Sequence, residues 1–232
     1  MADKDQKRSL ALYKIEQMIE TADSYIRMTY GPSIREFFQI FLDDLNLLQQ
    51  LYKVHKENVP NFVTTSRNVS ITYLKETLNH KITFDDQQFS LREDIFARLF
   101  STSIEIMRDL LPLGTVVELD ETFFKLNQRT NTSTKVVITK RFIAPKNYQS
   151  YFPYAGVIYP IGEVNPNSVL YFTEPLIQRI IHEGYKDEME NAYELLMKKE
   201  FIVDKDMNSI EFSTSDMHKL QKQLNEGKVG VK

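Results

Sequence analysis

The side chains best suited to acid–base or metal chemistry are scattered along this sequence. The four histidines are His55, His80, His182 and His218, and none belongs to an H-E-x-x-H or H-x-E pattern. A carboxylate follows His182 directly, but adjacent residues on a strand point to opposite faces of a sheet. This spacing predicts surface histidines that have no catalytic or metal-binding role.

Carboxylates occur as adjacent pairs at Asp43-Asp44, Asp85-Asp86 and Asp120-Glu121. Hydrolysis of a glycosidic bond needs two carboxyl groups that face each other across a cleft, one of them with a raised pKa. Neighbours in the sequence do not meet this requirement. We therefore interpret the three pairs as solvated charges on a helix edge and at turns.

Nucleophiles and phosphate-binding loops are equally scarce. The chain has no cysteine, which excludes disulfides, thiolate nucleophiles and cysteine-based zinc sites. It has seven glycines and none of the motifs G-x-x-x-x-G-K-[ST], G-x-G-x-x-G or G-x-S-x-G. We predict a protein that is not an enzyme and that uses no cofactor or metal. The alternative is an enzyme with an unfamiliar site.

The composition argues against some classes of partner. The 232 residues suffice for one large domain or two small ones, and a hydrophobic content of 42% is ordinary globular usage. A net charge of -3 argues against a nucleic-acid partner, because phosphate contacts need a basic excess. No apolar run reaches the roughly 18 residues of a membrane span, and no signal peptide is evident. We expect a cytoplasmic protein.

The first half of the sequence has the hydrophobic spacing of helices. Apolar residues recur every three or four positions from Leu12 to Ile26, and Gly31-Pro32 ends this stripe. Ser33 and Glu36 form a capping-box pattern, which predicts a second helix that continues to about Lys56. The two helices would form a helical hairpin.

Further elements follow this hairpin before Gly114. Residues 59–66 are expected to be a connector, residues 71–78 a short helix and residues 81–84 a short strand. A second capping box, Ser90 to Glu93, predicts another helix that ends before Gly114.

After Gly114, β-branched residues dominate and predict strands at 116–119, 135–143 and 154–159. The polar segment 127–134 is expected to be a loop. Residues 186–200 have the spacing of a helix. A short strand pair and a frayed polar helix are expected after it.

The fold class that these elements predict is α+β. A helical N-terminal half over residues 1–110 would precede a small, mainly antiparallel β-rich domain with a packed helix over 111–203. A polar C-terminal extension would occupy residues 204–232.

Three segments of the second half carry a recognisable pattern: Leu111 to Leu119, Tyr154 to Gly162 and Gly184-Tyr185. Together they resemble an uncharacterised domain family of Gram-positive bacteria, over about residues 110–200. Members are typically encoded beside type VII (ESX-like) secretion genes and LXG-type toxins. The resemblance implies a role connected with toxin export, and it implies no catalytic residue. Gly114 and Gly162 are expected to form turns with positive φ.

Apolar side chains offer two candidate contact surfaces for a partner. The first lies on the helix after Ser33 and consists of Phe37, Phe38, Phe41, Leu48 and Tyr52. The second is an aromatic cluster that includes Tyr151 and Tyr154. In both cases an ordinary core is the alternative. The broad apolar face of residues 33–56 also fits a homodimer.

Two functions follow from these features and the resemblance. The first is a cytoplasmic chaperone or targeting adaptor that covers the helical export region of an LXG-type toxin. The second is an immunity protein that neutralises a cognate toxin domain with an acidic patch or a loop. In both, the partner is another protein, with no nucleic acid and no membrane span.

Overall fold

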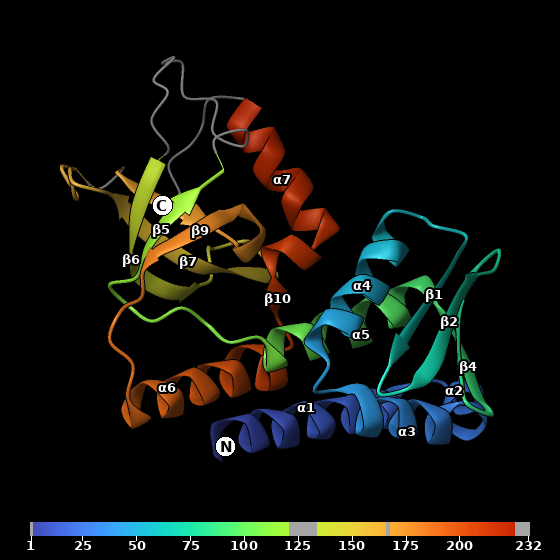
Figure 1. Ribbon diagram of the computed structural model, residues 1–232. Helices are drawn as coiled ribbons and strands as arrows, with labels where there is room; N and C mark the ends of the chain where they lie inside the picture. The colour runs from blue at the N-terminus through green and yellow to red at the C-terminus, as the bar shows by residue number, and fades with distance from the viewer. Residues whose placement is uncertain (1, 121–133, 166–167, 226–232) are drawn as a thin grey trace. The chain divides into compact units, whose positions relative to one another are not determined.

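The computed structural model describes residues 2–120, 134–165 and 168–225, in two compact units, Met1–Arg108 and Asp109–Lys232 (Figure 1). The first unit is rich in helices. The second is built on a mainly antiparallel sheet and has a helix near its C-terminal end. The α+β class with these two halves, which the sequence predicts, is therefore confirmed.

The first unit contains five helices in its described part. They are α1 (Ala2–Thr21), α2 (Ser24–Thr29), α3 (Gly31–Phe41), α4 (Leu45–Lys56) and α5 (Glu93–Met107). The helix that the sequence predicts from Ser33 to about Lys56 is therefore divided in two.

The break lies at Asp43-Asp44, because Asp44 acts as the N-cap of α4. Its carboxylate accepts a hydrogen bond from the backbone N–H of Leu47 at 3.0 Å. The capping box expected at Ser33 is not formed. Helix α3 starts earlier, at Gly31, with Pro32 in its first turn, and the Ser33 hydroxyl donates to Gln87 instead, at 2.7 Å.

A four-stranded antiparallel meander replaces the connector and the short helix that the sequence predicts before Ser90. Its strands are β1 (Asn61–Ser66), β2 (Val69–Lys75), β3 (Asn79–Phe84) and β4 (Gln87–Arg92), in the order β1-β2-β3-β4. The predicted helix over 71–78 is wrong for a physical reason. Ile71 and Tyr73 alternate with polar residues, so in the sheet both point to the buried face. The expected strand at 81–84 is confirmed within β3.

Phenylalanines fill the core of the first unit. The ring of Phe37 on α3 lies 5.3 Å from Phe84, 5.5 Å from Phe89 and 5.9 Å from Phe100, measured between centroids. These rings join α3 to the sheet and to α5, and edge-to-face contacts predominate among them. The meander and the helices therefore share one core.

The sheet of the second unit has the strand order β10-β7-β6-β5-β9, and β8 pairs with β7 as well. The strands are β5 (Val116–Leu119), β6 (Thr134–Ile143), β7 (Ser150–Ile158), β8 (Val169–Phe172), β9 (Ile177–His182) and β10 (Asn208–Ser209). All pairs are antiparallel except β10 with β7. The three strands predicted from β-branched residues are confirmed. The expected loop over 127–134 lies almost wholly outside the described residues.

Helix α6 (Glu188–Lys198) confirms the helix that the sequence predicts there, and it continues into a π-helix, Lys199–Asp204. A 3-10 helix, Ile210–Phe212, follows β10, so the predicted strand pair is absent from this part of the chain.

Helix α7 (Thr214–Asn225) is held to the sheet and is not a loose extension. The buried carboxylate of Asp216 accepts hydrogen bonds from the Ser150 hydroxyl and from the Gln149 backbone N–H, both at 2.8 Å. Burial by itself would raise the pKa of Asp216, but the hydrogen bonds from Lys219, Ser150 and the Gln149 backbone, with the charge of Lys219, together outweigh it and lower this pKa.

Candidate binding surface

The side chains predicted as partner contacts on α3 and α4 lie inside the first unit. Phe37, Phe38, Phe41 and Leu48 have no exposed surface, and Tyr52 is half-buried. The structure thus places four of the five in the core, the alternative that the sequence leaves open. The apolar residues of 33–56 that also fit a homodimer are mostly buried within the same unit.

Tyr151 and Tyr154 are also buried, with 4% and 0% of their surface exposed. Tyr151 packs against Phe142 and Phe201, with centroid distances of 5.4 Å to both. Tyr154 stacks on Phe172 at 5.5 Å. These two tyrosines therefore hold the second unit together, and the surface that a partner can reach must be sought elsewhere.

A partly exposed row of valines crosses one face of the second sheet. Val116 pairs with Val137, Val137 with Val157, and Val157 with Val169, so one residue of each strand from β5 to β8 lies in the row. Residues directly opposite in an antiparallel pair point to the same face. All four keep some solvent exposure, whereas their neighbours Val117 and Val136 have none. We call Val116, Val137, Val157 and Val169 the valine row.

Charged side chains border the valine row on one side. Glu118, two residues after Val116, pairs across the strands with Arg179 and Lys135. The Arg179 guanidinium donates to the Glu118 carboxylate at 2.7 Å. Tyr159, whose backbone N–H donates to the Lys135 carbonyl, is 55% exposed. An apolar centre with a polar rim is the usual composition of a protein-binding surface.

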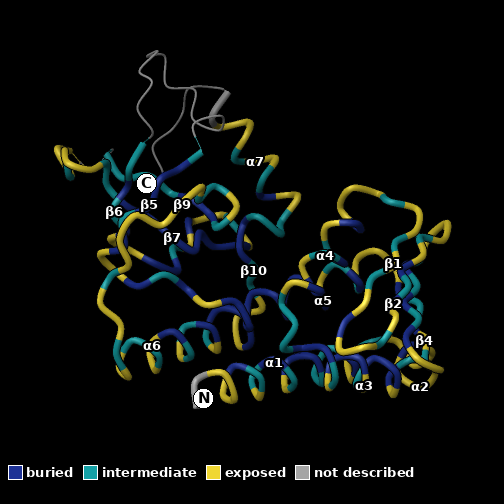
Figure 2. The backbone as a smooth tube through the Cα atoms, in the orientation of Figure 1, coloured by how far each residue is buried: buried dark blue, intermediate teal, exposed yellow. Residues whose placement is uncertain are grey.

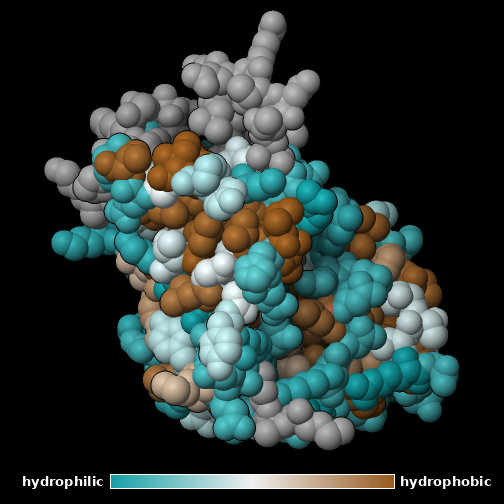
Figure 3. Space-filling model, turned by 60° about the vertical axis from the view of Figure 1, so that its left-hand side comes forward, coloured by the Kyte–Doolittle hydropathy of each residue, from teal (hydrophilic) through white to brown (hydrophobic). Residues whose placement is uncertain are grey.

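Other large apolar side chains of the second unit are exposed around its sheet. They come from the segment that precedes β5, from the loop after β7 and from β9: Leu113, Ile161, Val164, Ile180 and Ile181. Hydrophobic side chains gather on this unit in Figure 3, next to the grey residues at the top, with hydrophilic ones around them. Single exposed apolar residues are common on proteins, but a gathering of this kind indicates an interaction site.

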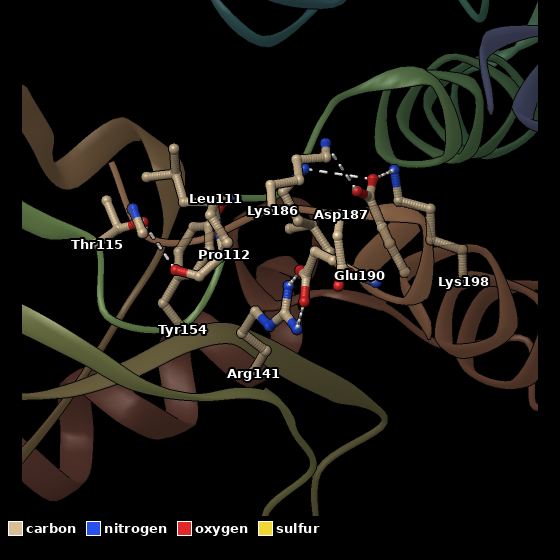
Figure 4. A network of polar contacts seen from close by, with 12 residues as sticks. Leu111, Pro112, Thr115, Arg141, Tyr154, Lys186, Asp187, Glu190 and Lys198 are labelled. Atoms are coloured by element: carbon tan, nitrogen blue, oxygen red, sulfur yellow. Dashed lines mark hydrogen bonds and ion pairs between the residues drawn. The ribbon is translucent and has the colours of Figure 1, made fainter. Parts of the chain in front are cut away.

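A network of polar contacts fixes the elements behind this surface (Figure 4). The Tyr154 hydroxyl accepts from the backbone N–H of Leu111 at 3.1 Å and donates to Glu174 at 2.9 Å. The Thr115 hydroxyl donates to the Pro112 carbonyl at 2.7 Å and accepts from the Gly184 N–H at 3.0 Å. The segment that enters β5 is therefore tied to β7 and to the end of β9.

The same network joins the sheet to α6. Arg141 of β6 and Glu190 of α6 point toward each other and form an ion pair, in which Arg141 Nη2 donates to Glu190 Oε2 at 3.1 Å. The Arg141 guanidinium also lies over the Tyr193 ring, 5.1 Å from its centroid. Both charges are held by fixed partners, so we interpret the network as a support for the sheet.

Two glycines of the second unit have the positive φ that the sequence predicts for them. Gly114 and Gly162 have positive φ, at 82° and 78°, as their turns require. Gly184 serves another purpose, because a Cβ there would lie 2.1 Å from the Leu113 carbonyl oxygen. Its lack of a side chain permits the close approach in which the Gly184 N–H donates to the Thr115 hydroxyl.

Two of the histidines are not on the surface, and the sequence interpretation is wrong for them. His55 of α4 and His80 of β3 are buried, with 5% and 2% exposed, and the Tyr73 hydroxyl lies 2.8 Å from His80 Nδ1. Burial lowers the pKa of His55 to about 4, with a smaller effect from His80, and it also lowers the pKa of His80. Burial raises the pKa of Tyr73 to about 12.

A sequence signal for these buried histidines did exist. His55 continues the stripe of Leu48 and Leu51 on α4, and His80 alternates with Ile82 and Phe84 on β3. In the described part of the chain, no group of three or more His, Asp or Glu side chains is placed to hold a metal ion. Nor does any described helix have the length and hydrophobicity of a membrane span.

Comparison with known proteins supports an uncharacterised domain family in the second half of the chain. Residues 110–193 match the family model described as a domain of unknown function (DUF4176). The match covers β5 to β9, with the valine row, and about the first half of α6. A search of curated proteins and a search of solved structures found no match to the chain.

Proposed function

We propose that this protein is a non-enzymatic binding protein that holds another protein on the valine row of its second unit. The observation that supports the proposal is a partly exposed apolar row on one face of the sheet, with a charged border and a network of polar contacts behind it. Along a strand, residues alternate between the two faces of the sheet, and those on a solvent-facing side are normally polar. Four paired valines on such a side therefore need another explanation.

The free energy expected from burying a single valine is small, so the contact must involve several residues. Complete burial of one valine contributes about 1.5 kcal/mol, and these valines are already partly buried. Each one alone would therefore add only a fraction of that amount. A partner must cover the row together with part of its rim, such as Tyr159, to bind with useful affinity.

The partner that the resemblance favours is a secreted LXG-type toxin of a type VII secretion system. We propose a cytoplasmic chaperone or targeting adaptor that covers the apolar side of the toxin's helical export region before secretion. A helix that lies on a sheet face with its apolar stripe inward is a common mode of packing. An immunity protein that blocks the toxic domain is the second candidate, and the loop expected for it lies outside the described residues.

Co-purification with two separate fragments of the neighbouring toxin distinguishes these functions. A chaperone or adaptor should retain the export region, whereas an immunity protein should retain the toxic domain and protect cells that express it. If the full chain binds neither fragment, both candidates are wrong.

A pair of matched variants tests the surface itself. Val137→Glu places a charge in the middle of the valine row and should weaken binding of the retained fragment at least about tenfold. Val63→Glu makes the same change at an exposed valine on β1 of the first unit, and it should leave binding unaltered. Equal effects of both variants would remove the valine row from the proposal.

A further inference from the structure

Strand β1 forms one edge of the four-stranded meander, because β2 is its sole sheet partner among the described strands (Figure 1). Its residues pair with β2 in one unbroken register, from Asn61 opposite Leu74 to Ser66 opposite Val69. In an antiparallel pair, every second residue turns its N–H and C=O toward the neighbouring strand, and the residues between turn theirs away. One set of backbone groups on β1 therefore points out of the sheet.

Two observations show which residues of β1 face β2. At one end, the Lys75 N–H donates to the carbonyl of Pro60 at 2.8 Å. At the other, the turn Arg67-Asn68 has positive φ at both residues, as a type I′ hairpin requires, so Ser66 and Val69 form a hydrogen-bonded pair. The even-numbered residues of β1 thus bond to β2.

The outward N–H and C=O groups belong to Asn61, Val63 and Thr65. Among the described residues, no hydrogen bond occupies these groups. Exposed and less exposed positions alternate along β1 (Figure 2), and the same three residues are the exposed ones, with Val63 at 63%. The backbone and the side chains of this edge are therefore both free to meet another strand.

The other sheet edges in the described part of the chain have features that discourage pairing. Proteins protect an edge with charged residues, with bulges or with short strands. Strand β4 contains Arg92 and runs directly into α5, β9 has two register shifts against β5, and β8 and β10 are short. Strand β1 has no charged residue and no bulge.

We propose that β1 pairs with the β1 of a second copy of this chain, antiparallel, about a twofold axis that passes at Val63. Asn61 then lies opposite Thr65 of the other copy, and Val63 lies opposite its own counterpart. Each of these residues donates once and accepts once, so the two strands share about six backbone hydrogen bonds. The two meanders join into one continuous sheet.

The outward side chains of β1 support a second copy as the occupant. They are polar, apolar and polar in order, from either end, so an antiparallel copy matches polar residues with each other and Val63 with Val63. A twofold axis also brings like charges together, and β1 has none to repel. The strand of a second copy is already ordered in its own sheet, so it loses less chain entropy than a loose peptide.

The size of the contact predicts how strong the dimer is. A pair of six-residue strands covers less than the roughly 1,000 Å² of a stable interface. The dimer is therefore weak and reversible, and it forms as the protein concentration rises.

Sedimentation velocity on the full chain, over a series of protein concentrations, tests this proposal. The unchanged protein should shift reversibly from monomer to dimer. A chain that is monomeric at every concentration would overturn the proposal. Growth into larger species would overturn it as well, because a twofold pairing of one edge closes at two copies.

Charges at Val63 distinguish a second copy from any other occupant. Val63→Glu and Val63→Lys should each weaken the dimer at least about tenfold, because like charges then lie opposite each other on the twofold axis. Both variants should keep the circular dichroism spectrum, since the position is exposed. An equal mixture of the two should restore the dimer, because opposite charges then meet. A mixture that stays monomeric would contradict the pairing of β1 with itself.

A single cysteine tests whether Val63 lies on the twofold axis, because the chain has no cysteine of its own. Cα atoms in a hydrogen-bonded antiparallel pair are about 5.5 Å apart, which allows a disulfide. Under mild oxidation, Val63→Cys should form a cross-linked dimer. Val164→Cys, at a valine of similar exposure in the second unit, should not. Equal cross-linking of the two variants would indicate random collision and overturn the proposal.

Mixed cysteine variants test the antiparallel register. Position 61 lies opposite position 65 of the other copy but about 14 Å from its own counterpart, a distance of four residues along a strand. Asn61→Cys alone and Thr65→Cys alone should therefore stay monomeric under oxidation, and a mixture of the two should cross-link. If each variant cross-links with itself, the strands do not pair in this register and the proposal is wrong.

The dimer and the proposed toxin contact use different units of the chain, so their failures can be told apart. Val63→Glu should weaken the dimer and leave binding of the toxin fragment intact, and Val137→Glu should do the opposite. Loss of toxin binding in Val63→Glu, with no change in oligomeric state, would assign the β1 edge to the toxin and overturn the dimer.

Discussion

The imidazole rings of His55 and His80 lie edge to face in the first unit, with their centroids 4.6 Å apart. They come from different elements, α4 and β3, and Phe96 of α5 packs against both, at 5.3 Å and 5.1 Å. Protonation of either ring would place a charge among aromatic side chains. Lys75 opposes it further at both rings, and Lys56 does so at His55. The carboxylate of Glu93 favours the charged form but does not outweigh burial.

This pair predicts that the first unit loses stability in mild acid. The pKa of His55 is about 4 in the folded protein and 6.5 in the unfolded chain, so the unfolded state binds more protons between these values. The stabilisation is complete above pH 6.5 and declines as the pH falls toward 4. At pH 5, His55 alone should cost about 2 kcal/mol relative to pH 7.5. Urea unfolding followed by circular dichroism at both pH values measures the difference.

Two variants show whether His55 causes the effect. His55→Phe should reduce the difference between the two pH values, since an uncharged ring then occupies the site. His182→Gln changes an exposed histidine and should leave the difference as it is. An unchanged pH dependence in His55→Phe would contradict the assignment.

The second prediction concerns the Tyr73 hydroxyl, which contributes to the stability of the same cluster as His55 and His80. Tyr73→Phe removes the group that lies 2.8 Å from His80 Nδ1 and leaves that buried nitrogen without this partner. We expect a loss of about 1 to 2 kcal/mol in the free energy of unfolding of the first unit. Tyr185→Phe, at a tyrosine that is 81% exposed, is the matched control and should change the free energy by less than about 0.5 kcal/mol.

The first unit shows where sequence patterns mislead. Residues 61–92 form a meander because each strand finds partners on both sides or against the helices, and such pairing is not visible in a short segment. Ser33 has the right spacing for a capping box, but the preceding Pro32 starts the helix earlier and Gln87 takes the hydroxyl. The meander and the Ser33–Gln87 hydrogen bond depend on residues far apart in the sequence, whereas the earlier helix start is a local effect of Pro32.

The binding surfaces could be predicted only in part. Phe37 and Phe41 have the spacing of a contact stripe, but a meander that was not foreseen covers them. The strands that carry Val116, Val137 and Val157 were foreseen, whereas their common row depends on register, which the turns and the β-bulge at residues 138–140 set. The helix over residues 186–200 was predicted as well, but the exposure of Met189, Tyr193 and Leu196 on it was not.

The third prediction concerns Gly184, whose backbone lies close to the Leu113 carbonyl. Gly184→Ala would place a methyl group 2.1 Å from the Leu113 carbonyl oxygen, so backbone must shift. We expect the second unit to lose about 3 kcal/mol of stability. Gly162→Ala should cost only about 1 kcal/mol, because its φ is positive but no described atom lies within 4 Å of the added carbon. Thermal unfolding of the two variants side by side gives the comparison.

Removal of one partner of the Arg141–Glu190 pair gives a fourth prediction. The Arg141 side chain is 2% exposed, and its Nε has no hydrogen-bond partner, so it depends on the Glu190 carboxylate for compensation. Glu190→Ala should therefore destabilise the second unit by about 3 kcal/mol, whereas Glu183→Ala at an exposed position should change it by less than about 0.5 kcal/mol.

The double variant Arg141→Met with Glu190→Ala distinguishes the contribution of the ion pair from that of side-chain packing. It leaves no buried charge, so it should recover part of the stability that Glu190→Ala loses, and urea unfolding of the four proteins in a double-mutant cycle measures the recovery. If the double variant is as unstable as the sum of the two single ones, the ion pair does not hold α6 to β6.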